Sequence, residues 1–210
     1  VRAVRAAVTR SKLGDGNGVK HLLADLAVRA LAERVPLRGR RALVTAAVDR
    51  YGLARALRDA GCDLALADLR MIGVPLTLRR LEAVEALAPA IMPVLARLPF
   101  SWVYPVGDDH AKLPERCRAE CERADILAGD YLQLEANLPR DLTGKAVITN
   151  TTTARDVEEL ARRNLHVLVT TTPRMDGRSF GTNVMEAACR CLIDKPDAEV
   201  RDADFLDLIE

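Results

Sequence analysis

The sequence predicts an α/β protein built on a doubly wound parallel sheet. Short apolar runs alternate with helical patterns along most of the chain, and this alternation is typical of parallel strands joined by crossover helices. The clearest unit is residues 41–68, where an apolar run, a polar turn, a short helix closed by Gly61 and a second apolar run ending in Asp68 follow one another. A ligand of such a sheet binds beyond the carboxyl ends of its strands, so we expect the function at that edge.

Each element is predicted from the spacing of its apolar residues. Residues 19–31 repeat leucine and alanine at helical intervals, which predicts an amphipathic helix that Pro36 ends. The expected strands cover residues 42–47, 64–67, 125–128, 145–149 and 166–170. Further helices are expected at residues 114–123, 131–138 and 154–163, and a last one from Thr182 or Asn183 to Leu192.

These boundaries predict three regions. Residues 1–36 form an N-terminal arm and a linking helix, residues 37–195 a Rossmann-like cofactor-binding domain, and residues 196–210 an acidic C-terminal strap. The first residue is Val1 and not methionine. One expectation is therefore a longer gene product, in which the arm is the remnant of an upstream lobe.

The bulk composition limits the classes of function. A formal net charge of +1 over 210 residues gives no electrostatic attraction to nucleic acid or to an anionic membrane. The longest apolar window, residues 86–96, contains Pro89 and Pro93 and is too short to span a bilayer. The five cysteines are odd in number and lack zinc-knuckle spacing, which indicates reduced thiols in a cytoplasmic protein without a structural metal. We expect a small-molecule substrate.

Residues 73–106 interrupt the regular alternation. Prolines divide this apolar, mostly helical segment into short pieces. We interpret the segment as an embellished crossover between two strands. The alternative is a contact surface of a homo-oligomer, because a long apolar insertion must be covered.

The turn after the first expected strand departs from the glycine-rich fingerprint of dinucleotide-binding proteins. Ala47, Asp49 and Gly52 stand where three glycines would be expected. Arg50 could offset the repulsion between Asp49 and a phosphate. Asp68 ends the second strand, where an acid hydrogen-bonds a ribose diol and repels a ribose phosphate, which favours NAD over NADP. The structural alternatives are that Asp68 caps a strand on the surface and that Asp49 is a helix N-terminal acid.

Two expected strands end in threonine triplets at the carboxyl edge. One triplet is residues 151–153 and the other is residues 170–172. Thr153 followed by Asp156 fits a helix-capping pattern, so at least one hydroxyl is expected to be structural. The threonines expected to point at a nicotinamide or ribose are Thr151, Thr152 and Thr171.

The loop that precedes the last expected helix carries two arginines. Arg174 and Arg178 lead into the helix start at Thr182 and Asn183. Arginines beside the free amide groups of a helix N-terminus suit a carboxylate or phosphate of the substrate. Asn183 with Glu186 is equally compatible with an ordinary helix cap.

The segment from Leu13 to Asp68 resembles the shikimate and quinate dehydrogenase family. That family has an Asn-Thr-Asp-Gly-x-Gly turn, a helix that leads out of it, and a Gly-Lys pair before the first strand of its cofactor domain. Residues 15–18, Asp-Gly-Asn-Gly, are similar to the turn, and Gly39-Arg40 precedes the first expected strand. Residues 170–187, TTTPRMDGRSFGTNVMEA, resemble bacterial proteins labelled as quinate dehydrogenase-like.

The resemblance implies an NAD-dependent dehydrogenase that transfers hydride between nicotinamide and a cyclic hydroxy acid such as quinate or shikimate. In the family, the aspartate of the turn pairs with a lysine and helps to move the proton of the substrate hydroxyl, which makes Asp15 the candidate catalytic residue. The family's lysine lies well upstream of the turn, and Lys12 and Lys20 are too near in sequence to be its counterpart. The glycine-rich cofactor turn is also missing.

Two other classes of function compete with the dehydrogenase. One is a non-catalytic Rossmann-like module that binds an anionic metabolite or nucleotide through Arg174, Arg178 and the amides at Thr182. The other is an assembly subunit that uses residues 73–106 as its contact surface. The first predicts binding without reduction of NAD, and the second predicts a large apolar interface.

Overall fold

The computed structural model describes residues 18–95, 97, 116–196 and 199–209. Two regions with sequence predictions lie outside these residues. One contains the candidate catalytic residue Asp15, and the other is the part of the expected contact segment from residue 98 to residue 106.

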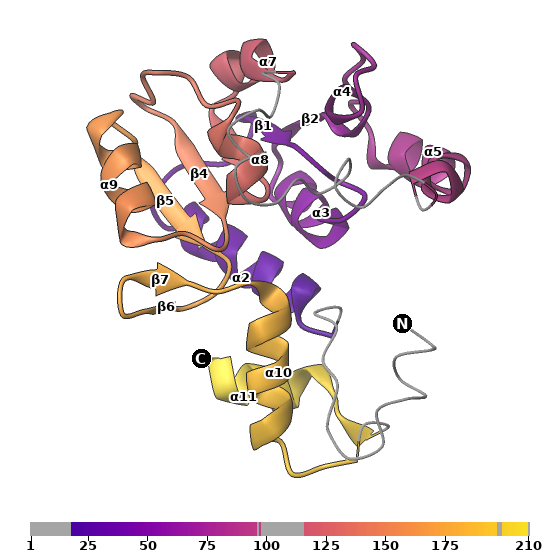
Figure 1. The fold of residues 1–210 in the computed structure, drawn as a ribbon, viewed down its shortest axis with the longest axis vertical. Helices are drawn as coiled ribbons and strands as arrows, with labels where there is room; N and C mark the ends of the chain where they lie inside the picture. The colour runs from indigo at the N-terminus through magenta and orange to yellow at the C-terminus, as the bar shows by residue number, and fades with distance from the viewer. Residues whose placement is uncertain (1–17, 96, 98–115, 197–198, 210) are drawn as a thin grey trace.

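A five-stranded parallel sheet forms the centre of the molecule (Figure 1). The strands stand in the order β2-β1-β3-β4-β5, and every neighbouring pair is parallel. The prediction of an α/β fold with a parallel sheet is confirmed, and the strand order is consistent with a Rossmann-like fold. The strand bounds are β1 Arg41–Val44, β2 Asp63–Leu66, β3 Ile126–Ala128, β4 Ala146–Thr149 and β5 Val167–Thr170.

Helices join the strands and flank the sheet. The five strands lie at or within one residue of their predicted ranges, but the first ends at Val44 because Thr45 and the residues after it already turn toward the next helix. Residues 174–179 form a β-hairpin that the sequence did not predict. The bounds are α2 Lys20–Ala32, α3 Tyr51–Asp59, α4 Asp68–Met71, α5 Leu81–Leu95, α7 Arg118–Arg123, α8 Tyr131–Glu135, α9 Ala154–Arg162, α10 Thr182–Leu192 and α11 Asp202–Ile209, with hairpin strands β6 Arg174–Met175 and β7 Arg178–Ser179.

Two apolar cores cover the two faces of the sheet. Successive residues of a strand point to opposite faces, and Leu43 and Val44 of β1 accordingly belong to different clusters. The Val44 side packs against α2, α3 and α5 through residues such as Leu31, Leu57 and Leu81. The Leu43 side packs against α7, α8 and α9. Burial on both faces explains why the strands read as continuous apolar runs.

A third, smaller cluster joins the start of α2 to α10 and α11. Val19 and Leu22 pack there with Cys189, Ile193 and Phe205. The C-terminal segment, expected from the sequence to be a surface strap that docks through Phe205 and its apolar neighbours, forms a helix, and Phe205 packs in this cluster. Figure 1 shows α10 and α11 extending away from the sheet on the side where α2 begins.

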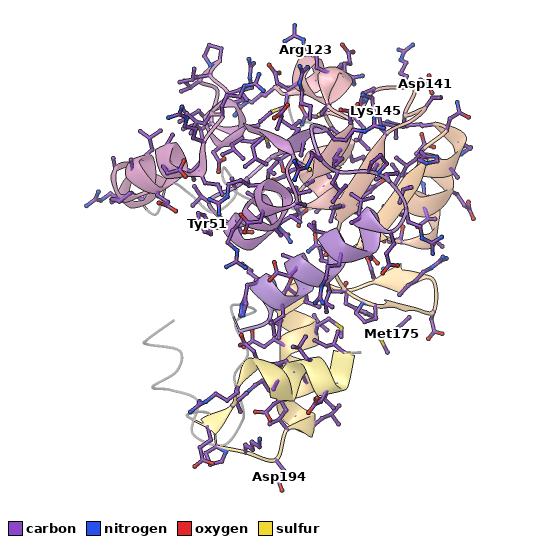
Figure 2. The ribbon with its side chains drawn as sticks, turned by 180° about the vertical axis from the view of Figure 1, so that it is seen from behind. Tyr51, Arg123, Asp141, Lys145, Met175 and Asp194 are labelled. Carbon is purple, nitrogen blue, oxygen red and sulfur yellow. The ribbon has the colours of Figure 1, made fainter. Side chains whose placement is uncertain are left out.

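The two ends of the sheet differ in their surroundings. Figure 2 shows Arg123 and Lys145 at one end, where β3 and β4 begin, and Tyr51 toward the other end, where β1 has ended. Lys145 donates hydrogen bonds to the carbonyl groups of Glu122 and Ala124, which ties the amino end together. The carboxyl end carries the polar residues considered below.

The outer edge of β2 is partly covered. Leu66 and Leu78 exchange two backbone hydrogen bonds of 2.8 and 3.0 Å, which occupies the edge at that point. Three large apolar side chains of this stretch are between 43% and 52% exposed, and they belong to Ile72, Val74 and Leu76. In the part of the chain that the structure describes, no helix combines the length and apolar character needed to cross a membrane.

Candidate functional site

Polar residues follow the strands at the carboxyl edge of the sheet. Because all five strands are parallel, the residues that come directly after them lie along one edge. Asp68 begins α4 beyond β2, and Thr171 continues the pairing of β5 with β4 through a 2.8 Å bond to the Thr149 carbonyl. The residues that follow the strands in sheet order are Asp68, Thr45, Asp130, Asn150 and Thr171.

Asp68 fixes the turn between β1 and α3. Its Oδ1 accepts a hydrogen bond of 2.8 Å from the Val48 backbone N–H. Its Oδ2 is buried and has no hydrogen-bond partner among the described residues. Burial raises the pKa of this carboxyl above its ordinary value, and the backbone hydrogen bonds only partly oppose that effect. Asp68 therefore has one buried oxygen that a donor from outside could satisfy.

The single glycine of the fingerprint turn serves packing between helices. A Cβ atom on Gly52 would lie 3.2 Å from Cα of His21, so α2 crosses the start of α3 at very short range. Ala47, at the first fingerprint position, is completely buried. Asp49 is exposed and precedes the helix, and α3 has no acidic residue in its first turn. The start of α3 is thus in close contact with α2 at Gly52.

Arg50 bridges the carboxyl ends of β3 and β4. Its Nη2 donates to Oδ2 of Asp130 and to Oδ1 of Asn150, both at 3.2 Å. Its side chain is only 12% exposed. Asp130 and Asn150 were not predicted as site residues, although each follows a buried strand, which is the signal that could have identified them.

The sheet edge between β1 and β3 is closely packed. The strand order reverses direction there, which is the usual place for a crevice. A Cβ atom on Gly129 would lie 2.1 Å from Oγ1 of Thr45. That hydroxyl donates to Oε1 of Gln133 at 3.2 Å. The backbone after β3 and the side chain after β1 therefore fill this point.

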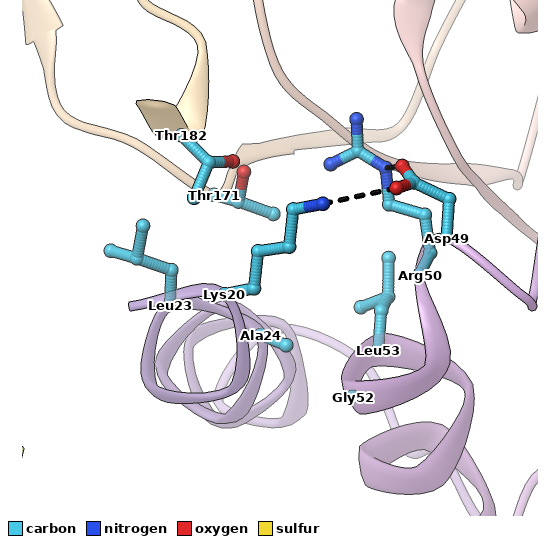
Figure 3. A pocket seen from close by; sticks show the side chains of 9 residues that line it. All are labelled: Lys20, Leu23, Ala24, Asp49, Arg50, Gly52, Leu53, Thr171 and Thr182. Carbon is cyan, nitrogen blue, oxygen red and sulfur yellow. Dashed lines mark hydrogen bonds and ion pairs between the residues drawn. The ribbon is translucent and has the colours of Figure 1, made fainter. Parts of the chain in front are cut away.

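A small pocket lies where α2, α3 and the start of α10 meet (Figure 3). Lys20 Nζ and Asp49 Oδ1, which belong to two lining residues, form an ion pair of 3.0 Å. Asp49 Oδ2 lies 3.6 Å from Arg50 Nε. Lys20 is too near the glycine turn in sequence to be the counterpart of the family's lysine, yet α2 brings it to the fingerprint turn. The lining residues are Lys20, Leu23, Ala24, Asp49, Arg50, Gly52, Leu53, Thr171 and Thr182.

The hydroxyls of the threonine triplets differ in what they bind. The Thr152 N–H donates a 2.8 Å hydrogen bond to the Ser179 hydroxyl, and the hydroxyls of Thr152 and Ser179 share a second hydrogen bond of 2.8 Å. The predicted cap is present, because Thr153 and Asp156 form a complete capping box on α9. Thr151 is exposed with φ of 56°, an uncommon conformation for a β-branched residue.

Thr171 is the exception in the second triplet. Thr170 and Thr172 donate to the Thr172 and Phe180 carbonyl groups at 2.9 and 2.6 Å. Thr171 is 8% exposed, and its Oγ1 has no hydrogen-bond partner in the described part of the chain.

The hairpin arginines are not lining residues of the pocket. Arg174 and Arg178 are on β6 and β7, and neither lines the pocket. Asn183 is exposed, whereas Thr182, the first residue of α10, is buried in the pocket wall. Four residues were expected to bind an anion: Arg174, Arg178, Thr182 and Asn183. Of these four, Thr182 lines the pocket, where it lies together with Asp49, Arg50, Gly52 and Thr171.

A family model, Domain of unknown function (DUF8754), matches residues 18–210. The chain belongs to the DUF8754 family. No curated protein and no solved structure matches the chain.

Metal-binding and thiol chemistry have little support in the described residues of this DUF8754 protein. No group of three or more His, Cys, Asp or Glu side chains comes together there in a way that could hold a metal ion. Burial raises the pKa of Cys62 and Cys117 to about 11 and that of Cys121 to about 12. These thiols remain protonated at neutral pH and are poor nucleophiles. The polar chemistry of the DUF8754 fold is concentrated at the carboxyl edge.

Proposed function

We propose that the chain is the cofactor-binding part of an NAD-dependent oxidoreductase of the shikimate and quinate dehydrogenase type. Its substrate would be a cyclic hydroxy acid. The proposal draws on the resemblance of residues 13–68 and 170–187 to that family and on the parallel sheet, whose carboxyl edge is where related folds bind nucleotides.

The position of Asp68 is the observation that carries the proposal. It follows β2 and holds the β1–α3 turn through Val48, and its Oδ2 lacks a donor among the described residues. A ribose hydroxyl would supply that donor, and a ribose phosphate would be repelled by the carboxylate, so NAD is preferred to NADP. Because Oδ2 is covered, the ribose reaches it only if the neighbouring turn moves.

The length of the polar row supports a dinucleotide. Asp68 and Thr171 follow β2 and β5, the outer strands, which are four strand intervals apart. At the usual strand spacing this is roughly 19 Å. A dinucleotide bound along the edge would extend from a ribose at Asp68 toward a nicotinamide near Thr171 and Thr151. Asp49 would repel a pyrophosphate, but Lys20 and Arg50 already offset its charge.

The proposed roles in the reaction divide between the cofactor and the chain. NAD, when bound, accepts hydride from the carbon that bears the substrate hydroxyl. By the resemblance, Asp15 takes the proton of that hydroxyl. Asp68 orients the ribose. The proton-transfer lysine of the family has no assigned counterpart here.

Calorimetric titration with NAD tests the proposal. We expect saturable binding that Asp68→Ala weakens by about 1–3 kcal/mol, because a hydrogen bond to a charged group is lost. Asp63→Ala is the matched control, since Asp63 is exposed at the opposite end of the same strand. If Asp68→Ala binds NAD with the affinity of the wild type, the proposed contact between Asp68 and the ribose is ruled out. Reduction of NAD with quinate or shikimate then tests the activity.

A non-catalytic module that binds an anionic metabolite or nucleotide is the second candidate. The observation that favours it is the use of Gly52 for contact with His21, which leaves the fingerprint turn without a glycine for close phosphate approach. This candidate predicts tight binding of an anionic compound with no reduction of NAD in the presence of any cyclic hydroxy acid.

A further inference from the structure

The pocket between α2, α3 and α10 combines several donors around a space of limited size. We propose that Lys20, Arg50, Thr171 and the amide groups at the start of α10 bind one small oxyanion, either a carboxylate or a phosphate group. This site goes beyond the cofactor proposal because it needs no nucleotide.

The N-termini of two helices lie at the pocket. α3 follows Arg50 and α10 begins at Thr182, and both residues line the pocket. Within the described part of the chain neither helix has a side-chain cap, and neither has an acidic residue in its first turn. The first N–H groups of a helix need acceptors, and the helix dipole favours negative charge there. Both helix ends therefore favour an anion in the same place.

The Thr171 hydroxyl is the second, independent indication of a ligand. Thr171 is 8% exposed, lines the pocket and leaves its Oγ1 without a partner among the described residues. Figure 3 shows the hydroxyls of Thr171 and Thr182 on the pocket side, above Lys20. A buried hydroxyl without a partner is unfavourable, and a bound oxyanion would accept a hydrogen bond from it.

Two cations complete the set of donors. Arg50 is held in place by Asp130 and Asn150, and its Nε is buried with no hydrogen bond to any residue that the structure describes. Lys20 Nζ has a 3.0 Å bond to Asp49, which leaves other protons for a ligand. Figure 3 shows the Asp49 carboxylate paired with both cations, with Oδ1 3.0 Å from Lys20 Nζ and Oδ2 3.6 Å from Arg50 Nε.

The carboxylate of Asp49 occupies the cations that a ligand would bind, and a ligand can displace it. Its side chain is 41% exposed, so its carboxylate can turn into solvent when another anion approaches Lys20. A ligand must therefore compete with Asp49 for the same cations. This competition distinguishes a binding site from a purely structural ion pair, because removal of the Asp49 charge should strengthen ligand binding.

The size of the space limits the ligand. The volume of the pocket is about 30 Å³, which is room for roughly two to three water molecules. This volume matches one carboxylate or phosphate group. If the proposed dehydrogenase activity holds, the group is the carboxylate of the hydroxy acid.

Calorimetric titrations of the full chain with inorganic phosphate and with acetate, at constant ionic strength and without NAD, test the site. We expect saturable binding of at least one anion. Lys20→Met and Thr171→Val should each weaken it by about tenfold or more, and Asp49→Asn should strengthen it by about two- to fivefold. Tighter binding of phosphate identifies a phosphate ligand, and acetate binding that is at least as tight identifies a carboxylate.

Two matched controls accompany these variants. Thr170→Val removes a neighbouring hydroxyl that does not line the pocket, and Lys195→Met removes a lysine paired with Asp204 elsewhere. Both should bind the anion as the wild type does. The site is overturned if neither anion binds saturably, or if Lys20→Met and Thr171→Val bind as the wild type does. If the wild type binds the anion but does not bind NAD, the cofactor proposal is overturned and this inference stands.

Discussion

The backbone of Gly129 lies against the side chain of Thr45, so closely that a Cβ atom would be 2.1 Å from the threonine Oγ1. Thr45 follows β1 and Gly129 follows β3, and these two strands are neighbours in the sheet. The contact closes the sheet edge at the point where the strand order reverses. Any ligand of this edge must therefore bind above the contact or to one side of it.

Substitution of Gly129 by alanine should destabilise the fold because the new methyl group meets Thr45. We expect Gly129→Ala to lower the free energy of unfolding by about 1–3 kcal/mol or more. Thr45→Ala removes the obstructing atoms, so the pair should show a favourable coupling of about 1–3 kcal/mol in a double-mutant cycle by urea denaturation.

Gly144 provides the control for this cycle. Its φ is 74°, but among the described residues no atom lies within 4 Å of the position that an added methyl group would take. Gly144→Ala should cost about 1–2 kcal/mol through backbone strain alone, with no coupling to Thr45→Ala. Equal coupling in both cycles would mean that steric contact does not explain the Gly129 effect.

The pH dependence of stability should reveal the buried carboxyl of Asp68. Burial raises its folded-state pKa above the ordinary value of 3.8. Folding therefore favours the protonated form, and this favourable contribution is lost as pH rises through the folded-state pKa. Asp68→Asn cannot titrate, so the unfolding free energy of the wild type should fall relative to this variant between pH 3.8 and neutral pH. A constant difference across that range would contradict the raised pKa.

Much of the fold follows from local patterns in the sequence. Strands such as Val167–Thr170 and Ala146–Thr149 were predictable because they are apolar runs between helical segments. The cap at Thr153 was predictable because both of its partners lie within one helical turn. The hairpin at residues 174–179 was missed because its strands are only two residues long.

The pocket could not be predicted from the sequence. Lys20 meets Asp49 because α2 crosses α3 at Gly52, and that crossing depends on how two helices pack. The bridge from Arg50 to Asn150 similarly depends on the order of strands in the sheet. Residues far apart in the chain meet there, and no local spacing encodes their distance.

Cys191 should be the most reactive thiol of the protein. The other four cysteines are buried, and burial raises the pKa of Cys62, Cys117, Cys121 and Cys189. With a thiol-reactive disulfide reagent at neutral pH, we expect one fast equivalent in the folded protein and five after denaturation. Cys191→Ser should abolish the fast equivalent. A fast equivalent that persists in this variant would show that a buried cysteine is accessible.

The conformation of Thr151 should reduce stability. Its φ of 56° is unfavourable for a β-branched side chain, whereas asparagine adopts it more readily. Thr151→Asn should therefore raise the unfolding free energy by about 1 kcal/mol in thermal or urea denaturation. The control is the opposite substitution, Asn164→Thr. Asn164 has φ of 62°, so threonine at this position should lower the unfolding free energy. Destabilisation by Thr151→Asn would mean that its side chain makes a more important contact.

The proposed role of Asp15 predicts a separation between catalysis and cofactor binding. If Asp15 takes the proton of the substrate hydroxyl, Asp15→Asn should lower kcat for NAD reduction with quinate or shikimate by about 10²–10⁴-fold. NAD affinity measured by calorimetry should stay within about twofold of the wild type, because the proposed ribose contact at Asp68 is retained. Asp141→Asn is the control, since Asp141 is exposed and makes local bonds to Thr143. An Asp15→Asn variant with the kcat of the wild type would assign the proton transfer to another group.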